Sequence, residues 1–142
     1  MKVSSLPYHL MIPGLISILI LVFMVIHRRK LFKTGKWKWF WISAAVFFGV
    51  YLLIVGEAAY FDISYNQDLQ KFDTNGDGFF TANEISPEQK EAMRKVVSDT
   101  GRNFAVFTGL IFSGVLALLV FTGGNILEFI KLKARKSKPN KF

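Results

Sequence analysis

The sequence contains no cysteine, and only four prolines and two histidines among its 142 residues. Without cysteine, disulfide bonds, thiolate catalysis and cysteine-ligated metal sites are excluded. Neither histidine, His9 or His27, has a carboxylate partner nearby in the sequence, and no nucleophile motif or phosphate-binding loop is present. We therefore expect no enzymatic activity, and a role as a subunit of a membrane enzyme is the weakest functional alternative.

Charge is nearly absent from three long apolar blocks, residues 8–26, 39–61 and 104–126, which contain one acidic residue, Glu57. At about 1.5 Å of rise per residue, a helix of each length crosses a hydrocarbon core of about 30 Å. The first block is followed by HRRK and not by a small-residue cleavage site, which favours a retained anchor over a signal peptide. The sequence therefore predicts an all-α integral membrane protein with three transmembrane helices.

Positive charge is concentrated beside these blocks and gives the chain a net charge of +8. Six basic residues and no acidic one separate the first two blocks: Arg28, Arg29, Lys30, Lys33, Lys36 and Lys38. After the third block, Glu128 stands against Lys131, Lys133, Arg135, Lys136, Lys138 and Lys141. The positive-inside rule places both clusters in the cytoplasm, and the N-terminus and the acidic segment 62–102 outside. Contact with anionic lipids is the alternative role of the clusters, and we expect no nucleic-acid partner.

These patterns divide the chain into six segments. Residues 1–27 form the N-terminal segment and first transmembrane helix, 28–38 a basic cytoplasmic loop, and 39–61 the second transmembrane helix. Residues 62–102 form an extracytoplasmic insertion, 103–127 the third transmembrane helix and 128–142 a basic cytoplasmic tail. We expect Gly123 and Gly124 to loosen or end the third helix. Small residues predict helix contacts at Ala45 and Gly49 and at Gly109, Ser113 and Ala117.

One stretch of the insertion, DTNGDGFFTANE, carries chemical specificity. Its oxygen donors are the side chains of Asp73, Asn75, Asp77, Thr81 and Glu84 and the carbonyl of Phe79, with Gly78 at the point where the chain must turn. Calcium prefers six to eight oxygen ligands at about 2.3 to 2.6 Å, whereas magnesium requires a smaller, rigid octahedron. The stretch therefore predicts a calcium site.

The same stretch resembles the calcium-binding loop of the EF-hand family, because it matches D-x-[DN]-x-[DN]-G-x5-E at every specified position. The resemblance extends over about residues 62–97 and implies a helix–loop–helix unit. It implies side-chain ligation by Asp73, Asn75 and Asp77, carbonyl ligation by Phe79, direct or water-mediated ligation by Thr81, and bidentate ligation by Glu84. EF-hands usually work in pairs, so a lone hand favours pairing with a second copy of this protein or with another membrane subunit.

The flanks of the loop indicate how it connects to the membrane. Helical character is expected from Trp39 to about Lys71, with Tyr65, Leu69 and Phe72 forming one apolar face. On the other side, SPEQ predicts a capping box at Ser86 and a new helix from Pro87. Any change in the angle between the two helices of the hand would act on two transmembrane helices.

The leading hypothesis is a calcium-binding membrane protein whose single extracytoplasmic hand stabilises or switches a membrane assembly, as a small accessory subunit. Membrane lipids are its expected surroundings. The alternative is a homo-oligomeric cation channel or transporter component, in which Glu57 would be an intramembrane polar site. A position at the outer interface is the other explanation for Glu57.

Overall fold

A computed structural model describes residues 7–33, 37–81, 84–97 and 100–136 of the chain. Its regular structure within these ranges is entirely helical: α1 (Tyr8–Ile26), α2 (Arg28–Leu31), α3 (Lys38–Gln70), α4 (Pro87–Val97), α5 (Thr100–Asn103) and α6 (Ala105–Lys136). In the described part of the chain, three helical stretches, α1, α3 and the stretch that contains α6, are long and apolar enough to cross a membrane. The predicted all-α fold, with three helices able to cross a membrane, is confirmed for these residues.

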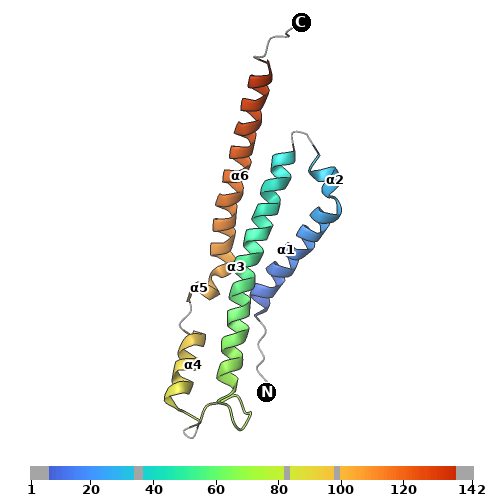
Figure 1. Ribbon diagram of the computed structural model, residues 1–142. Coiled ribbons are helices and arrows are strands. Elements are labelled where there is room, and N and C mark those ends of the chain that lie inside the picture. Colours follow the sequence, from blue (N-terminus) through green and yellow to red (C-terminus); the bar gives the residue numbers. More distant parts are fainter. Residues whose placement is uncertain (1–6, 34–36, 82–83, 98–99, 137–142) are drawn as a thin grey trace.

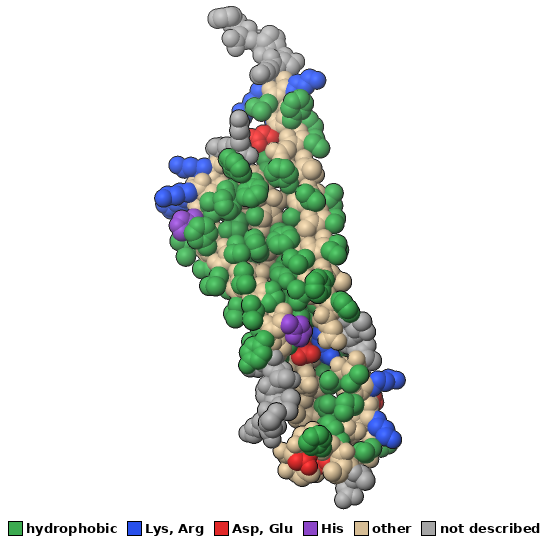
Figure 2. Space-filling view, turned by 180° about the vertical axis from the view of Figure 1, so that it is seen from behind, with side chains coloured by type: hydrophobic (Ala, Val, Ile, Leu, Met, Phe, Trp, Pro, Cys, Tyr) green, Lys and Arg blue, Asp and Glu red, His purple; other side chains and the backbone are tan. Residues whose placement is uncertain are grey.

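The long helix α3 forms the centre of the molecule (Figure 1). Both α1 and α6 pack along α3, whereas α1 and α6 hardly touch each other. A small core lies where the start of α1 meets the middle of α3 and the start of α6; its buried residues are Leu10, Tyr51, Val55, Ala58 and Ala105. Most other apolar side chains of the three helices face outward, in a broad hydrophobic band that suits lipid better than water (Figure 2).

The second span and the segment that follows it form one continuous helix. No proline falls between Lys38 and Gln70, and α3 runs without a break over that whole range. At about 1.5 Å per residue, α3 is well over the length needed to cross the hydrocarbon core. The expected helix from Trp39 to about Lys71 is therefore confirmed, and the final turns of α3 carry the loop away from the apolar band (Figure 1).

The expectation that Gly123 and Gly124 loosen or end the third helix is wrong. Helix α6 continues through both glycines to Lys136. Gly124 is buried beneath the indole of Trp39, where any added Cβ atom would overlap the ring. Gly124 therefore allows the close approach of α3 to α6. The helix continues through both glycines because, in an apolar medium, the backbone N–H and C=O groups have no other hydrogen-bond partners than those within the helix.

A second close approach between α3 and α6 lies at Gly109. A Cβ atom added there would lie 3.2 Å from the ring of Tyr51 and 3.3 Å from Ile54. Ser113, one turn later, is fully buried and its hydroxyl donates to the Gly109 carbonyl at 2.6 Å. The predicted contact at Gly109 and Ser113 is confirmed, whereas the one at Gly49 is wrong within this chain, because an added Cβ at Gly49 would meet nothing within 4 Å.

Gly109, which is in close contact, and Gly49, which is not, give a matched test of the helix packing. We predict that Gly109→Ala lowers the free energy of unfolding by about 1–3 kcal/mol, because the new methyl group overpacks the contact with Tyr51. Gly49→Ala should leave stability unchanged or slightly raised, since the position is open and alanine favours helix. Titration with a denaturing detergent, followed by circular dichroism, measures both values. Equal values for the two variants would contradict the packing at Gly109.

Candidate functional site

The predicted calcium loop follows directly from the end of α3. Asp73 stands at its beginning, and both oxygens of its carboxylate accept hydrogen bonds from the loop backbone. The N–H of Gly76 donates to Oδ1 at 2.8 Å and the N–H of Gly78 donates to Oδ2 at 3.0 Å. Gly76 and Gly78 have φ values of 72° and 82°, in the left-handed region that other residues rarely adopt. The two glycines therefore let the chain curl around Asp73.

Asn75 and Asp77, the next two predicted ligands, stabilise the same turn of the backbone. Asp77 donates its N–H to Oδ1 of Asn75 at 3.0 Å, and Phe79 donates its N–H to Oδ1 of Asp77 at 2.7 Å. The side-chain amide of Asn75 also donates to Oδ2 of Asp77 at 2.9 Å. Each of these backbone bonds spans two residues, the pattern by which Asn and Asp form tight turns. Phe79 itself points its ring into solvent.

Glu84 closes the loop by reaching back to its first residues. Oε1 accepts hydrogen bonds from the N–H and hydroxyl of Thr74, at 2.9 and 2.8 Å, and from the N–H of Asn75 at 3.2 Å. Oε2 accepts from the N–H and hydroxyl of Thr81, at 3.0 and 3.2 Å. The side chain is buried. One carboxylate therefore connects both ends of the loop.

These bonds also set the charge of the carboxylate. The N–H of Thr81, followed by the hydroxyl of Thr74, lowers the pKa of Glu84 to about 2. A lowered pKa in the folded protein stabilises the fold above the ordinary carboxyl pKa, and this contribution is lost as the pH falls toward about 2. Glu84 is therefore an anion at every pH near neutrality.

Among the five residues predicted to ligate through side-chain oxygen (Asp73, Asn75, Asp77, Thr81 and Glu84), side-chain hydrogen bonds join Asn75 to Asp77 and Thr81 to Glu84. The Asp73 carboxylate accepts instead from the backbone of Gly76 and Gly78. Three of the five predicted ligands are carboxylates and all five supply oxygen, which fits a hard cation. Nevertheless, no three His, Cys, Asp or Glu side chains among residues 7–33, 37–81, 84–97 and 100–136 are grouped as a metal site. The carboxylates face the loop's own N–H and O–H groups in this form, so cation binding requires exchange of some of these bonds, above all at Glu84.

Ser86 starts the helix that leaves the loop. Its hydroxyl accepts a hydrogen bond from the N–H of Gln89 at 3.1 Å, and α4 begins at Pro87. The predicted new start of the helix at Ser86 is confirmed, together with this half of the capping box. The backbone N–H of Glu88 and the Ser86 hydroxyl also lower the pKa of the Glu88 carboxyl. The start of α4 therefore lies only a few residues after Glu84.

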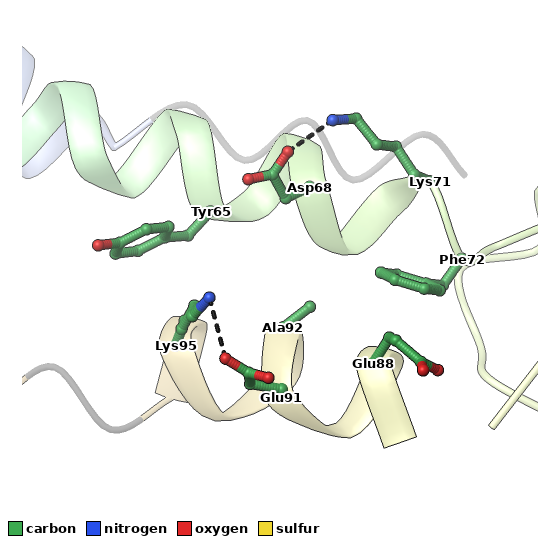
Figure 3. Close-up of a pocket in the computed structure, with 8 residues that line it drawn as sticks. All are labelled: Tyr65, Asp68, Lys71, Phe72, Glu88, Glu91, Ala92 and Lys95. Carbon is green, nitrogen blue, oxygen red and sulfur yellow. Dashed lines mark hydrogen bonds and ion pairs between the residues drawn. The ribbon is translucent and has the colours of Figure 1, made fainter. Parts of the chain in front are cut away.

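The last turns of α3 and helix α4 lie side by side and enclose a groove (Figure 3). Tyr65 of α3 and Phe72, just after the end of α3, lie opposite Ala92 of α4. Leu69 of α3 is buried. The predicted apolar face of Tyr65, Leu69 and Phe72 is confirmed. Two exposed ion pairs border the groove, Asp68 with Lys71 at 2.6 Å and Glu91 with Lys95 at 3.2 Å.

Arg102 joins three elements at the other end of α4. It belongs to α5, and its side chain is 3% exposed. The guanidinium Nε forms an ion pair at 3.2 Å with Asp62 of α3, whose side chain is 15% exposed, and NH2 donates to the Val96 carbonyl of α4 at 2.7 Å. The guanidinium also lies over the ring of Tyr65, 5.2 Å from its centroid. One buried cation thus fixes α4 and the start of the third span against α3.

Arg102 was not among the functional residues predicted from the sequence. The available signal was its position just before the third apolar block, opposite Asp62 just after the second. In an antiparallel pair of helices these two positions come to the same height. Glu57, by contrast, is exposed on α3, and its role as an intramembrane polar site stays a prediction.

Comparisons of the chain with models of protein families, with curated proteins and with solved structures found no match. The loop and its connections to the helices therefore remain the features of the molecule that point to a function.

The buried ion pair gives a stability prediction. Arg102→Met should lower the free energy of unfolding by about 3–5 kcal/mol, because it leaves the Asp62 carboxylate buried without its cation. Lys95→Met, which breaks the exposed pair with Glu91, should cost less than about 1 kcal/mol. Denaturing-detergent titration measures both. Adding Asp62→Asn to Arg102→Met should recover part of the loss, and an Arg102→Met protein as stable as the Lys95→Met control would refute a structural role for the pair.

Proposed function

We propose that this chain is a calcium-binding membrane protein in which the loop from Asp73 to Glu84 stabilises or switches a membrane assembly. The observation that carries the proposal is the closure of the loop by Glu84, whose carboxylate accepts hydrogen bonds from Thr74 near the start of the loop and from Thr81 near its end. We assign this unit to the EF-hand type on the motif match, with residues 62–97 as its extent.

The ligands would be the side chains of Asp73, Asn75, Asp77, Thr81 and Glu84 and the carbonyl of Phe79. When bound, calcium supplies positive charge to three carboxylates that otherwise repel one another within a short loop. The residue that must move most is Glu84, since its Oε1 accepts three hydrogen bonds in the present form. Any shift of Glu84 acts on the start of α4 through Ser86.

The charge pattern supports an orientation with the N-terminus and the loop outside the cytoplasm, and with segment 28–38 and the C-terminal tail inside. Extracellular calcium-binding modules of this kind have dissociation constants of about 10⁻⁴ to 10⁻³ M. Calcium well above that concentration would keep the loop filled, and a loop that is always filled would serve a structural role.

Calcium titration of the purified full chain in detergent tests the proposal. We expect heat to be exchanged on calcium addition, with a dissociation constant near 10⁻⁴ to 10⁻³ M, and weaker heat with magnesium. Glu84→Gln should weaken calcium binding by at least about tenfold, because it removes a charged, bidentate ligand. Glu88→Gln is the matched control: this exposed carboxylate lies on α4, outside the loop, and its loss should leave the affinity unchanged. No calcium-dependent heat from the wild-type chain would exclude the proposal.

A partner is the second part of the proposal. Phe79 and Ile85 are 76% and 47% exposed, and exposed apolar side chains beside the loop support contact with another protein. We propose a second copy of the chain or another membrane subunit at this surface. Size measurement by light scattering in detergent should show a larger particle with calcium than with chelator. The Phe79→Ser/Ile85→Ser variant should lose that difference, and a wild-type particle of constant, monomeric size would contradict self-association.

A further inference from the structure

A groove at the opposite end of the molecule combines positive charge with apolar walls. It lies between the start of α3 and the last turns of α6, has a volume of about 210 Å³, and is lined by Lys38, Trp39, Leu127, Glu128, Lys131, Leu132 and Arg135. Three cations and one anion give it a net charge of +2 (3 − 1). The volume is below that of most pockets for drug-sized ligands, about 300–1,000 Å³, and suits a small charged group.

The position of the groove corresponds to the edge of the membrane. Lys38 and Trp39 stand at the start of α3, where its apolar stretch begins, and the α6 residues follow the apolar stretch of that helix. Figure 2 shows Lys and Arg side chains gathered at this end of the molecule, beyond the broad hydrophobic band. Tryptophan and basic side chains are enriched at the height of the lipid headgroups. A ligand in this groove would therefore reach it from the headgroup layer.

The geometry of Trp39 shows that the groove is built and not an accidental gap. Glycine is the only residue type that fits at position 124, beneath the indole, because an added Cβ atom would overlap the ring. The indole thus forms a fixed wall, and the Lys38 ammonium lies over it, 5.7 Å from the ring centroid. This cation–π contact holds a positive charge in place on the α3 side of the groove.

Helix α6 supplies the other charges on one face. Lys131 and Arg135 are four residues apart and therefore neighbours on the helix surface. Leu127 and Leu132, both 54% exposed, lie along the same groove. This arrangement offers cations for a phosphate and, beside them, uncovered apolar side chains for acyl chains. A free inorganic anion would leave the two leucines in contact with water.

We propose that this groove binds the phosphate headgroup of an anionic phospholipid, with Lys38, Lys131 and Arg135 contacting the phosphate and Leu127 and Leu132 contacting the acyl chains. Basic pockets between transmembrane helices bind anionic headgroups in this way. This lipid site does not depend on calcium binding by the loop at the other end of the molecule.

Native mass spectrometry of the full chain, after incubation with dioleoyl phosphatidylglycerol or dioleoyl phosphatidylcholine, tests this site. We expect bound phosphatidylglycerol to survive detergent removal and phosphatidylcholine to be lost. Lys131→Gln/Arg135→Gln should weaken phosphatidylglycerol binding about tenfold or more. Arg28→Gln/Arg29→Gln removes the same charge from the same end of the molecule but from α2, outside the groove, and should leave binding intact.

A second pair of variants tests the wall of the groove. Gly124→Ala should displace the indole of Trp39 and reduce phosphatidylglycerol binding, whereas Gly123→Ala, where an added Cβ meets nothing within 4 Å, should not. Circular dichroism checks that each variant is folded; the Lys131/Arg135 double variant alters only exposed side chains and keeps the test decisive if Gly124→Ala unfolds.

Three results would overturn the proposal. Equal loss of lipid in the α2 and α6 double variants would show diffuse charge attraction and no site. Equal retention of both lipids would show that the charge is not recognised. Displacement of phosphatidylglycerol by an equal concentration of inorganic phosphate would show an anion site that does not require a lipid.

Discussion

The arrangement of the helices beside the loop depends on the ion pair between Arg102 and Asp62. Removal of two charges from water costs several kcal/mol each, and the cost is offset only when the geometry satisfies both groups. Here the Val96 carbonyl and the Tyr65 ring complete the surroundings of the guanidinium. The same contacts bring α3, α4 and α5 together. The pair therefore sets the position of the two helices that flank the loop.

The helices on the two sides of the loop differ in continuity. On the entering side, α3 is a single helix from the membrane to the loop. On the leaving side, a turn at Phe104 lies between α5 and α6. A shift of Glu84 would reach α4 first, because α4 begins at Pro87. Arg102 opposes such movement, because it holds the C-terminal end of α4 to α3 through the Val96 carbonyl.

Local sequence predicted the three long apolar helices, the length of α3, the start of α4 and the turns of the loop. These features depend on neighbours along the chain: apolar runs, the absence of proline, a capping serine, and Asp, Asn and Gly at turn positions. The sequence did not predict the Arg102–Asp62 pair or the contact of Gly124 with Trp39. Both join residues far apart in the chain, and a helix-breaking role is the natural expectation for two adjacent glycines when the indole that covers one of them is unknown.

Close contacts between α3 and α6 occur near both ends of the pair, at Gly109 against Tyr51 and at Gly124 against Trp39. Interfaces made of small residues against rings have little room to slide, because any translation brings a ring onto a residue that has a side chain. Calcium binding in the loop would then leave the positions of α3 and α6 relative to each other unchanged. We therefore favour a calcium clamp that orders the loop and α4 over a switch that moves α3 and α6.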